Sequence, residues 1–127
     1  MRPLRHSCAA VVIAASFLAP ATASAFDRLC DPAFENCRTP LIDLIRNETV
    51  GIDVGFWFME DSRFSTELVR AWGRGVPVRV IIDTKANSSY PGNVPNINAL
   101  ASAGIPIRRV NSRYFHWKTM IFAFQNV

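Results

Sequence analysis

The sequence lacks two features that would set its class at once. No apolar stretch reaches the roughly 20 residues that a membrane-spanning helix requires, so we do not expect a membrane-spanning protein. Acidic side chains are absent from the last third, because all ten carboxylates lie at or before Asp83. The cations that follow Asp83 are Lys85, Arg108, Arg109, Arg113 and Lys118. Such a local positive field attracts phosphate groups, unless carboxylates distant in sequence neutralise it in the folded protein.

The N-terminus has the composition of a secretory signal peptide. Two arginines precede the apolar run of residues 8–18, and small residues offer a cleavage site after Ala25. Cleavage would remove residues 1–25 and lower the formal net charge from +4 to +2. Residues 26–127 are enough for one small domain but not for two. The sequence therefore predicts a secreted or periplasmic single-domain protein.

Cys30 and Cys37 are the two cysteines that remain after such processing. In an oxidising compartment we expect them to form a disulfide. Closing so small a loop would stabilise the fold by roughly 2–3 kcal/mol. A metal site is the poorer alternative, because two cysteines and the one remaining histidine do not make a zinc motif.

Helical and strand patterns alternate along the rest of the chain. Helices are indicated by apolar residues at helical spacing between capping residues and glycine, and strands by short runs of apolar or aromatic residues. The strand over 50–59 is expected to be buried on both faces, and the strand over 78–82 to be a second strand buried in this way. The predicted elements are a helix that Thr39 caps and Pro40 begins, a strand over 50–59, a helix from Asp61 or Ser62 to Gly73 or Gly75, a strand over 78–82, a helix over 95–103, a strand over 105–110 and a strand over 114–122.

One five-residue pattern occurs twice. Residues 75–79 (Gly-Val-Pro-Val-Arg) recur as residues 104–108 (Gly-Ile-Pro-Ile-Arg), each time after a helical pattern and before a β-branched run. Glycine can end the helix and proline is tolerated where a strand begins. This alternation predicts an α/β fold with right-handed crossovers and a mainly parallel sheet flanked by helices.

A polar, turn-rich segment over residues 84–93 follows the strand over 78–82. Ligand sites of open α/β sheets gather at the carboxyl ends of parallel strands. Asp83, at that strand end, is therefore a candidate substrate-binding residue. The alternative is that its carboxylate braces the loop.

His116 and Lys118 lie two residues apart in the last predicted strand, so their side chains would share a face. A lysine ammonium can hold the anionic oxygens of a phosphate while a neutral imidazole nitrogen attacks phosphorus. The alternative is a surface pair on either side of a buried Trp117.

The His-x-Lys pair, placed after Ile105-Pro106-Ile107-Arg108, resembles the signature of the phospholipase D superfamily. Residues 30–37 and 51–59 also resemble its secreted bacterial members. The resemblance implies that His116 is a nucleophile that forms a phosphohistidine, that Lys118 grips the phosphate, and that no metal or other cofactor is needed. The implied substrate is a phosphodiester, either in a phospholipid, with peripheral membrane contact, or in a nucleic acid.

The sequence departs from the family pattern in three ways. The family's aspartate falls at Ala123, where Gln125 or Asn126 would have to substitute for it. Arg113 and Asn126 are the remaining candidate substrate-binding residues. Only one copy of the motif is present, so activity would require a homodimer. No glycine follows Gly104 and the chain ends at Val127, which suggests an incomplete half of the family's fold.

Three hypotheses remain open at this point. The first is a phospholipase D-like enzyme that hydrolyses the head-group ester of phospholipids. The second is a metal-independent periplasmic nuclease that acts as a homodimer. The third is a truncated fragment that keeps part of the fold but has no complete catalytic site.

Overall fold

The structure is a computed structural model that describes residues 28–111 and 115–123. The predicted signal peptide, Arg113 and Asn126 lie outside these residues. In the described part of the chain, no helix is both long and apolar enough to cross a membrane. The elements are α1 (Arg38–Asn47), β1 (Ile52–Phe56), α2 (Ser62–Gly73), β2 (Val78–Asp83), α3 (Ala86–Ser89), α4 (Asn93–Ser102), β3 (Ile107–Val110) and β4 (Lys118–Phe122).

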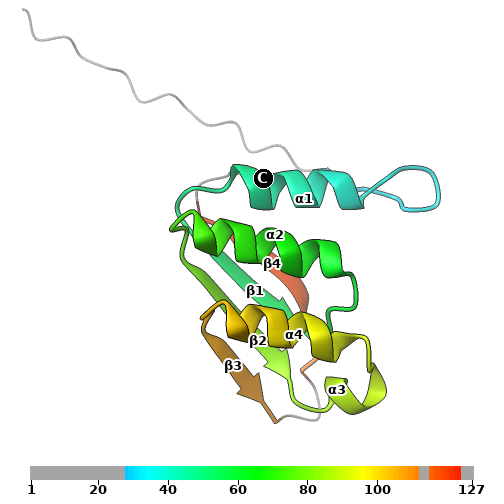
Figure 1. Ribbon diagram of the computed structural model, residues 1–127. Helices are drawn as coiled ribbons and strands as arrows, with labels where there is room; N and C mark the ends of the chain where they lie inside the picture. Colours follow the sequence, from blue (N-terminus) through cyan, green and yellow to red (C-terminus); the bar gives the residue numbers. More distant parts are fainter. Residues whose placement is uncertain (1–27, 112–114, 124–127) are drawn as a thin grey trace, which may run out of the picture.

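The described residues form one four-stranded sheet with the strand order β3-β2-β1-β4. Strands β3, β2 and β1 are parallel, whereas β4 runs antiparallel to β1. Helices α1, α2 and α4 lie together on one face of this sheet (Figure 1). The predicted α/β fold with a mainly parallel sheet flanked by helices is confirmed.

The hydrophobic core lies between the sheet and the helices that cover it. Alternate strand residues point to this core, because successive side chains of a strand face opposite sides of the sheet. The fully buried apolar residues of the strands and of α2 and α4 are Ile52, Val54, Val78, Val80, Ile82, Leu68, Ala71, Ile97 and Leu100. The prediction that the first two strands are buried on both faces is wrong. Asp53 is only half-buried and Arg79 is exposed, since the helices cover one face only.

The repeated glycine turn is confirmed at both positions. Gly75 and Gly104 have φ angles of 87° and 85°, in the left-handed region that glycine enters most readily. The N–H of Val76 donates to the Ala71 carbonyl at 3.1 Å, and the N–H of Ile105 donates to the Leu100 carbonyl at 3.2 Å. This 6→1 bond is typical of a Schellman motif, and it turns α2 into β2 and α4 into β3 in the same way.

The predicted helix starts differ from the structure by two residues or fewer. Asp61 caps α2 as predicted, since its side chain accepts from the N–H of Arg63. Helix α1 begins at Arg38, one residue before the predicted cap Thr39, because the side chain of Asn36 accepts from the N–H groups of Arg38 and Thr39 at 3.1 and 3.2 Å. Helix α4 begins at Asn93, two residues before the predicted start at 95.

The predicted disulfide is present. Cys30 and Cys37 are bonded, with their Cα atoms 5.6 Å apart. The bond closes the loop that precedes α1. Within that loop the N–H groups of Phe34 and Glu35 both donate to the Asp31 carbonyl at 3.0 Å, so backbone turns and the disulfide hold the same short segment.

Candidate active site

His116 and Lys118 lie at the edge of the sheet where the parallel strands end. Lys118, the first residue of β4, is paired with Phe56, the last residue of β1. One step further, the N–H of Trp57 donates to the Trp117 carbonyl at 2.7 Å. The predicted strand over 114–122 begins too early, because β4 starts at Lys118 and residues 115–117 precede it; residue 114 is outside the described part.

Aromatic side chains surround the pair. The His116 ring lies 3.9 Å from the Trp57 ring, measured between centroids, with an interplanar angle of 61°. The Nζ atom of Lys118 lies 5.2 Å from the centroid of Phe58. Tyr90, which precedes α4, stacks on Phe58 at 4.1 Å and meets Trp57 edge-on at 5.1 Å. The structure therefore brings the two motif residues together in one cluster with three rings.

Two buried asparagines of α4 fix the segment that carries Trp57 and Phe58. The N–H of Met59 donates to Asn93 Oδ1 at 2.7 Å, and Asn96 Nδ2 donates to the Met59 carbonyl at 2.9 Å. Asn93 and Asn96 are 0% and 5% exposed. Both backbone groups of Met59 are thus held by side chains, as buried polar groups require. Sequence reasoning missed these asparagines, although polar residues on the buried stripe of a helix are a usable signal.

Asp83 lies at the carboxyl end of β2, as predicted. It is 5% exposed, and its Oδ1 accepts from the N–H of Lys85 at 2.7 Å. The neighbouring Thr84 N–H donates to the Val110 carbonyl at 3.2 Å. Asp83 therefore braces the loop after β2, and its role in substrate binding stays a prediction. Arg113 and Asn126 lie outside the described residues, so their predicted roles are not tested either.

Four cations of the last third have no ion-pair partner among residues 28–111 and 115–123. These are Lys85, Arg108, Arg109 and Lys118. The arginines that do pair with carboxylates all precede them: Arg28, Arg38, Arg46, Arg63, Arg70 and Arg79. In this part of the chain, no carboxylate therefore lies within ion-pair distance of the late cations. The same residues contain no group of three histidine, cysteine or acidic side chains that could hold a metal ion.

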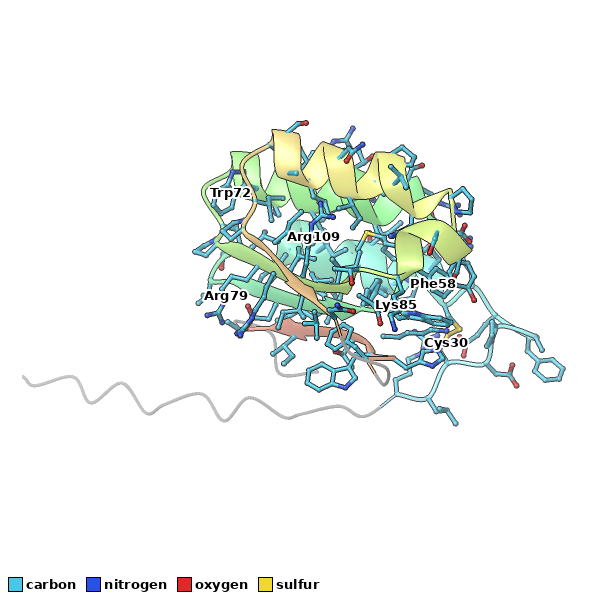
Figure 2. All side chains as sticks on the ribbon, turned by 90° about the horizontal axis from the view of Figure 1, so that it is seen from below. Cys30, Phe58, Trp72, Arg79, Lys85 and Arg109 are labelled. Carbon is cyan, nitrogen blue, oxygen red and sulfur yellow. A yellow bond between two sulfur atoms is a disulfide. The ribbon has the colours of Figure 1, made fainter. Side chains whose placement is uncertain are left out.

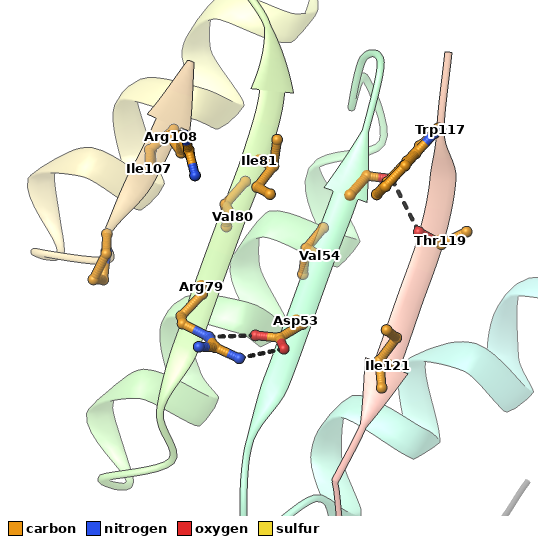
Figure 3. Close-up of a pocket in the computed structure, with 12 residues that line it drawn as sticks. Asp53, Val54, Arg79, Val80, Ile81, Ile107, Arg108, Trp117, Thr119 and Ile121 are labelled. Carbon is orange, nitrogen blue, oxygen red and sulfur yellow. Dashed lines mark hydrogen bonds and ion pairs between the residues drawn. The ribbon is translucent and has the colours of Figure 1, made fainter. Parts of the chain in front are cut away.

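The face of the sheet opposite the helices carries a hollow of about 570 Å³. Its floor is formed by side chains of all four strands (Figure 3). On it, Asp53 accepts two hydrogen bonds from Arg79, at 2.6 and 2.5 Å, which raises the pKa of this arginine above its usual value. Arg108 also lines the hollow, opposite Ile81 across the β2–β3 pair (Figure 3). Figure 2 shows Arg79 at one end of the molecule and Phe58 with Lys85 at the other.

Trp117 lies over this hollow and is 58% exposed. The alternative of a buried Trp117 between two surface residues is therefore wrong. A Cβ atom at Gly55 would lie 3.2 Å from Trp117 Cε3 and 3.1 Å from Thr119 Oγ1. Gly55 thus leaves the space that Trp117 occupies across the strand pair. The hollow and the His116–Lys118 pair meet at this tryptophan, which stands between the two motif residues in sequence.

No curated protein matches this chain. Among solved structures, it is similar to a phospholipase D family member, Nuc from Salmonella typhimurium, with 27% sequence identity and a TM-score of 0.60. That match covers 68% of this chain and 57% of Nuc, so the chain spans little more than half the length of the structure it resembles.

A family model supplies the assignment. The model described as "Cardiolipin synthase, PLD-like domain" matches residues 41–126, which is more than half of the chain and includes His116 and Lys118. The order of elements, the motif pair at the sheet edge and the structural similarity all agree with that match. The chain therefore belongs to the phospholipase D superfamily of phosphodiesterases.

Proposed function

We propose that this protein hydrolyses phosphodiesters, with His116 as the nucleophile and Lys118 as the group that holds the phosphate. The observation that carries the proposal is the position of both side chains in one cluster at the carboxyl ends of β1 and β2. Ligand sites of open α/β sheets gather at this edge. Fold alone does not define chemistry, and it is this pair of side chains that supplies a nucleophile and a cation.

In the proposed reaction, a ring nitrogen of neutral His116 forms a bond to phosphorus while the bond from phosphorus to the leaving oxygen breaks. The ammonium of Lys118 stabilises the negative charge on the phosphoryl oxygens. The leaving oxygen takes a proton from a general acid. Water then attacks the phosphohistidine, gives a proton back to that acid, and releases a phosphomonoester with the free imidazole.

The general acid requires a second histidine, and we propose that a second copy of this chain supplies it. Beyond His6 in the predicted leader, His116 is the only histidine in the sequence. A symmetric dimer places the same patch of both copies opposite each other, so two motif copies can face one cleft. Equilibrium sedimentation checks this, and a monomer that remains fully active when diluted would contradict it.

The decisive experiment is hydrolysis of bis-p-nitrophenyl phosphate in the presence of EDTA. We expect turnover by the exported protein and none by His116→Ala. Lys118→Met should weaken turnover strongly, whereas Lys118→Arg keeps the charge and should retain more. Urea unfolding of each variant controls for loss of fold. Equal turnover of His116→Ala and the wild type would contradict the mechanism, and a folded but inactive wild type would favour the hypothesis of an incomplete fragment.

A nucleic acid is the substrate that the unpaired cations favour. Lys85, Arg108, Arg109 and Lys118 have no carboxylate partner among the described residues, and phosphate contacts by such cations make binding salt-dependent. We expect metal-free degradation of single-stranded DNA that weakens as salt is raised. Cleavage of phospholipid vesicles without any effect on DNA would instead support the phospholipid hypothesis, with peripheral membrane contact.

We also propose that residues 1–25 are a signal peptide and that residues 26–127 form the phospholipase D-like domain of a secreted or periplasmic protein. The Cys30–Cys37 disulfide supports this setting, because disulfides persist in oxidising compartments. N-terminal sequencing of the exported protein should begin at Phe26. A protein that keeps its first residues after export would contradict the proposal.

A further inference from the structure

The imidazole of His116 is held in an unusual way. In the described part of the chain it has no hydrogen bond and no ion pair, and the residue itself is exposed. Among the described residues, the aromatic ring that it contacts is that of Trp57, 3.9 Å away between centroids. An exposed side chain without such a contact exchanges freely between its staggered rotamers, so the orientation of this imidazole depends on Trp57.

Trp57 is itself fixed on several sides. Its backbone N–H donates to the carbonyl of Trp117, the residue after His116, at 2.7 Å. Its ring meets Tyr90 edge-on at 5.1 Å and Phe58 edge-on at 5.3 Å. Edge-to-face pairs of this kind are favourable beyond the apolar area that they bury. The Trp57 ring is therefore held in place by its neighbours, and the imidazole of His116 packs against it.

We infer that Trp57 is a positioning residue that holds the imidazole of His116 in the orientation needed for attack on phosphorus. This inference rests on the proposed function. A nucleophile that is already aligned with the reacting atom avoids the entropic cost of finding that geometry. In most enzymes that use a histidine, a hydrogen-bonded group orients the ring, and here an aromatic contact takes that role. The backbone bond from Trp57 to Trp117 does not depend on the side chain, so substitutions at 57 test the ring alone.

The first test is spectroscopic and needs no activity. In the full chain with His6→Asn, His116 is the only histidine, so its imidazole C–H resonances are unambiguous in a proton NMR spectrum. The ring current of Trp57 should shift them away from the position of a free histidine. Trp57→Leu should return them to that position, and Trp57→Phe should retain part of the shift. Trp72→Leu is the matched control, because it removes a half-buried tryptophan of α2 and should leave the resonances unchanged.

The second test is kinetic. Trp57→Leu should lower kcat on bis-p-nitrophenyl phosphate by on the order of 100-fold, since a small misplacement of a reacting group has effects of this size. KM should change little, and Trp57→Phe should recover most of the rate. His116 resonances that do not move in Trp57→Leu would overturn the inference, as would a moved resonance with an unchanged kcat. A wild type without turnover would defeat the proposed function, while the NMR comparison would still decide whether Trp57 holds the ring.

Discussion

Replacing Asn96 with alanine should destabilise the protein by about 2–4 kcal/mol. Its Nδ2 donates to the Met59 carbonyl at 2.9 Å, and its Oδ1 accepts from the Ser65 hydroxyl at 2.8 Å. Met59 is 2% exposed and Ser65 is also 2% exposed, so water does not easily replace the lost partners. A buried polar group left without a partner costs about 1–3 kcal/mol. Without Asn96, the single Ser65 hydroxyl proton can still be donated to the Ser62 carbonyl, 3.0 Å away. The expected loss of stability therefore lies below the upper limit for two unsatisfied groups.

The assay is urea unfolding followed by tryptophan fluorescence, with a thermal scan beside it. For a domain of about 100 residues, the expected loss lowers the melting temperature by roughly 10–25 °C. Asn98→Ala is the matched control, because Asn98 lies on the same helix but is exposed, and surface substitutions usually stay within about 0.5 kcal/mol. A free energy of unfolding for Asn96→Ala equal to that of Asn98→Ala would refute the assignment of Asn96 as the anchor of Met59.

Two further predictions concern acid and the open face of the sheet. The hydrogen bond from Arg46, at 2.9 Å, holds the pKa of the buried Glu67 below its usual value of 4.5, with Arg70 adding to the effect. A carboxylate whose pKa is lower in the folded state stabilises the protein above its unfolded-state pKa, and this stability is lost as the pH falls through the folded-state pKa. The urea concentration at the unfolding midpoint should therefore decrease as the pH is lowered below about 4.5. The urea midpoint of Glu67→Gln should decrease less over the same pH range. An equal decrease in the variant and the wild type would count against this ion pair. Gly55→Val should displace Trp117, because Trp117 Cε3 would lie 3.2 Å from the new Cβ. Phosphodiester hydrolysis should then decrease, with only a small change in the free energy of unfolding. Unchanged kinetics would show that Trp117 can move without affecting turnover.

The fold was predictable because its signals are local and repeated. Apolar residues at helical spacing and β-branched runs gave the order of helices and strands, and the two Gly-x-Pro turns gave parallel neighbours. The positive φ angles at Gly75 and Gly104 are the physical basis of that repeat. The start of a helix was predicted incorrectly where a side chain that precedes the helix caps its first N–H groups. Asn36 caps α1 from two residues before its first residue, and propensity alone does not reveal which of several polar residues takes this role.

The candidate site was predictable only in part. A two-residue spacing and a family resemblance pointed to His116 and Lys118, and the structure brings both to one sheet edge. The rings of Trp57, Phe58 and Tyr90 could not be placed there from the sequence, because their contacts join segments that are distant along the chain. The error at Trp117 has a simpler cause. Trp117 shares a face of the sheet with Thr119 and Ile121, which also line the hollow, and the helices cover only the opposite face.

The geometry of β4 explains why stability and activity should respond to different substitutions. Met120 and Phe122 of this strand pack towards the core, whereas Thr119 and Ile121 line the hollow on the opposite face. Lys118 begins the same strand, one residue after Trp117, which also lines the hollow. A change in the hollow can therefore shift the start of β4, and with it the motif pair, without opening the core. Since the apolar area buried in the core sets most of the folding free energy, substitutions in the hollow should alter turnover more than unfolding, and substitutions of Met120 or Phe122 should do the reverse.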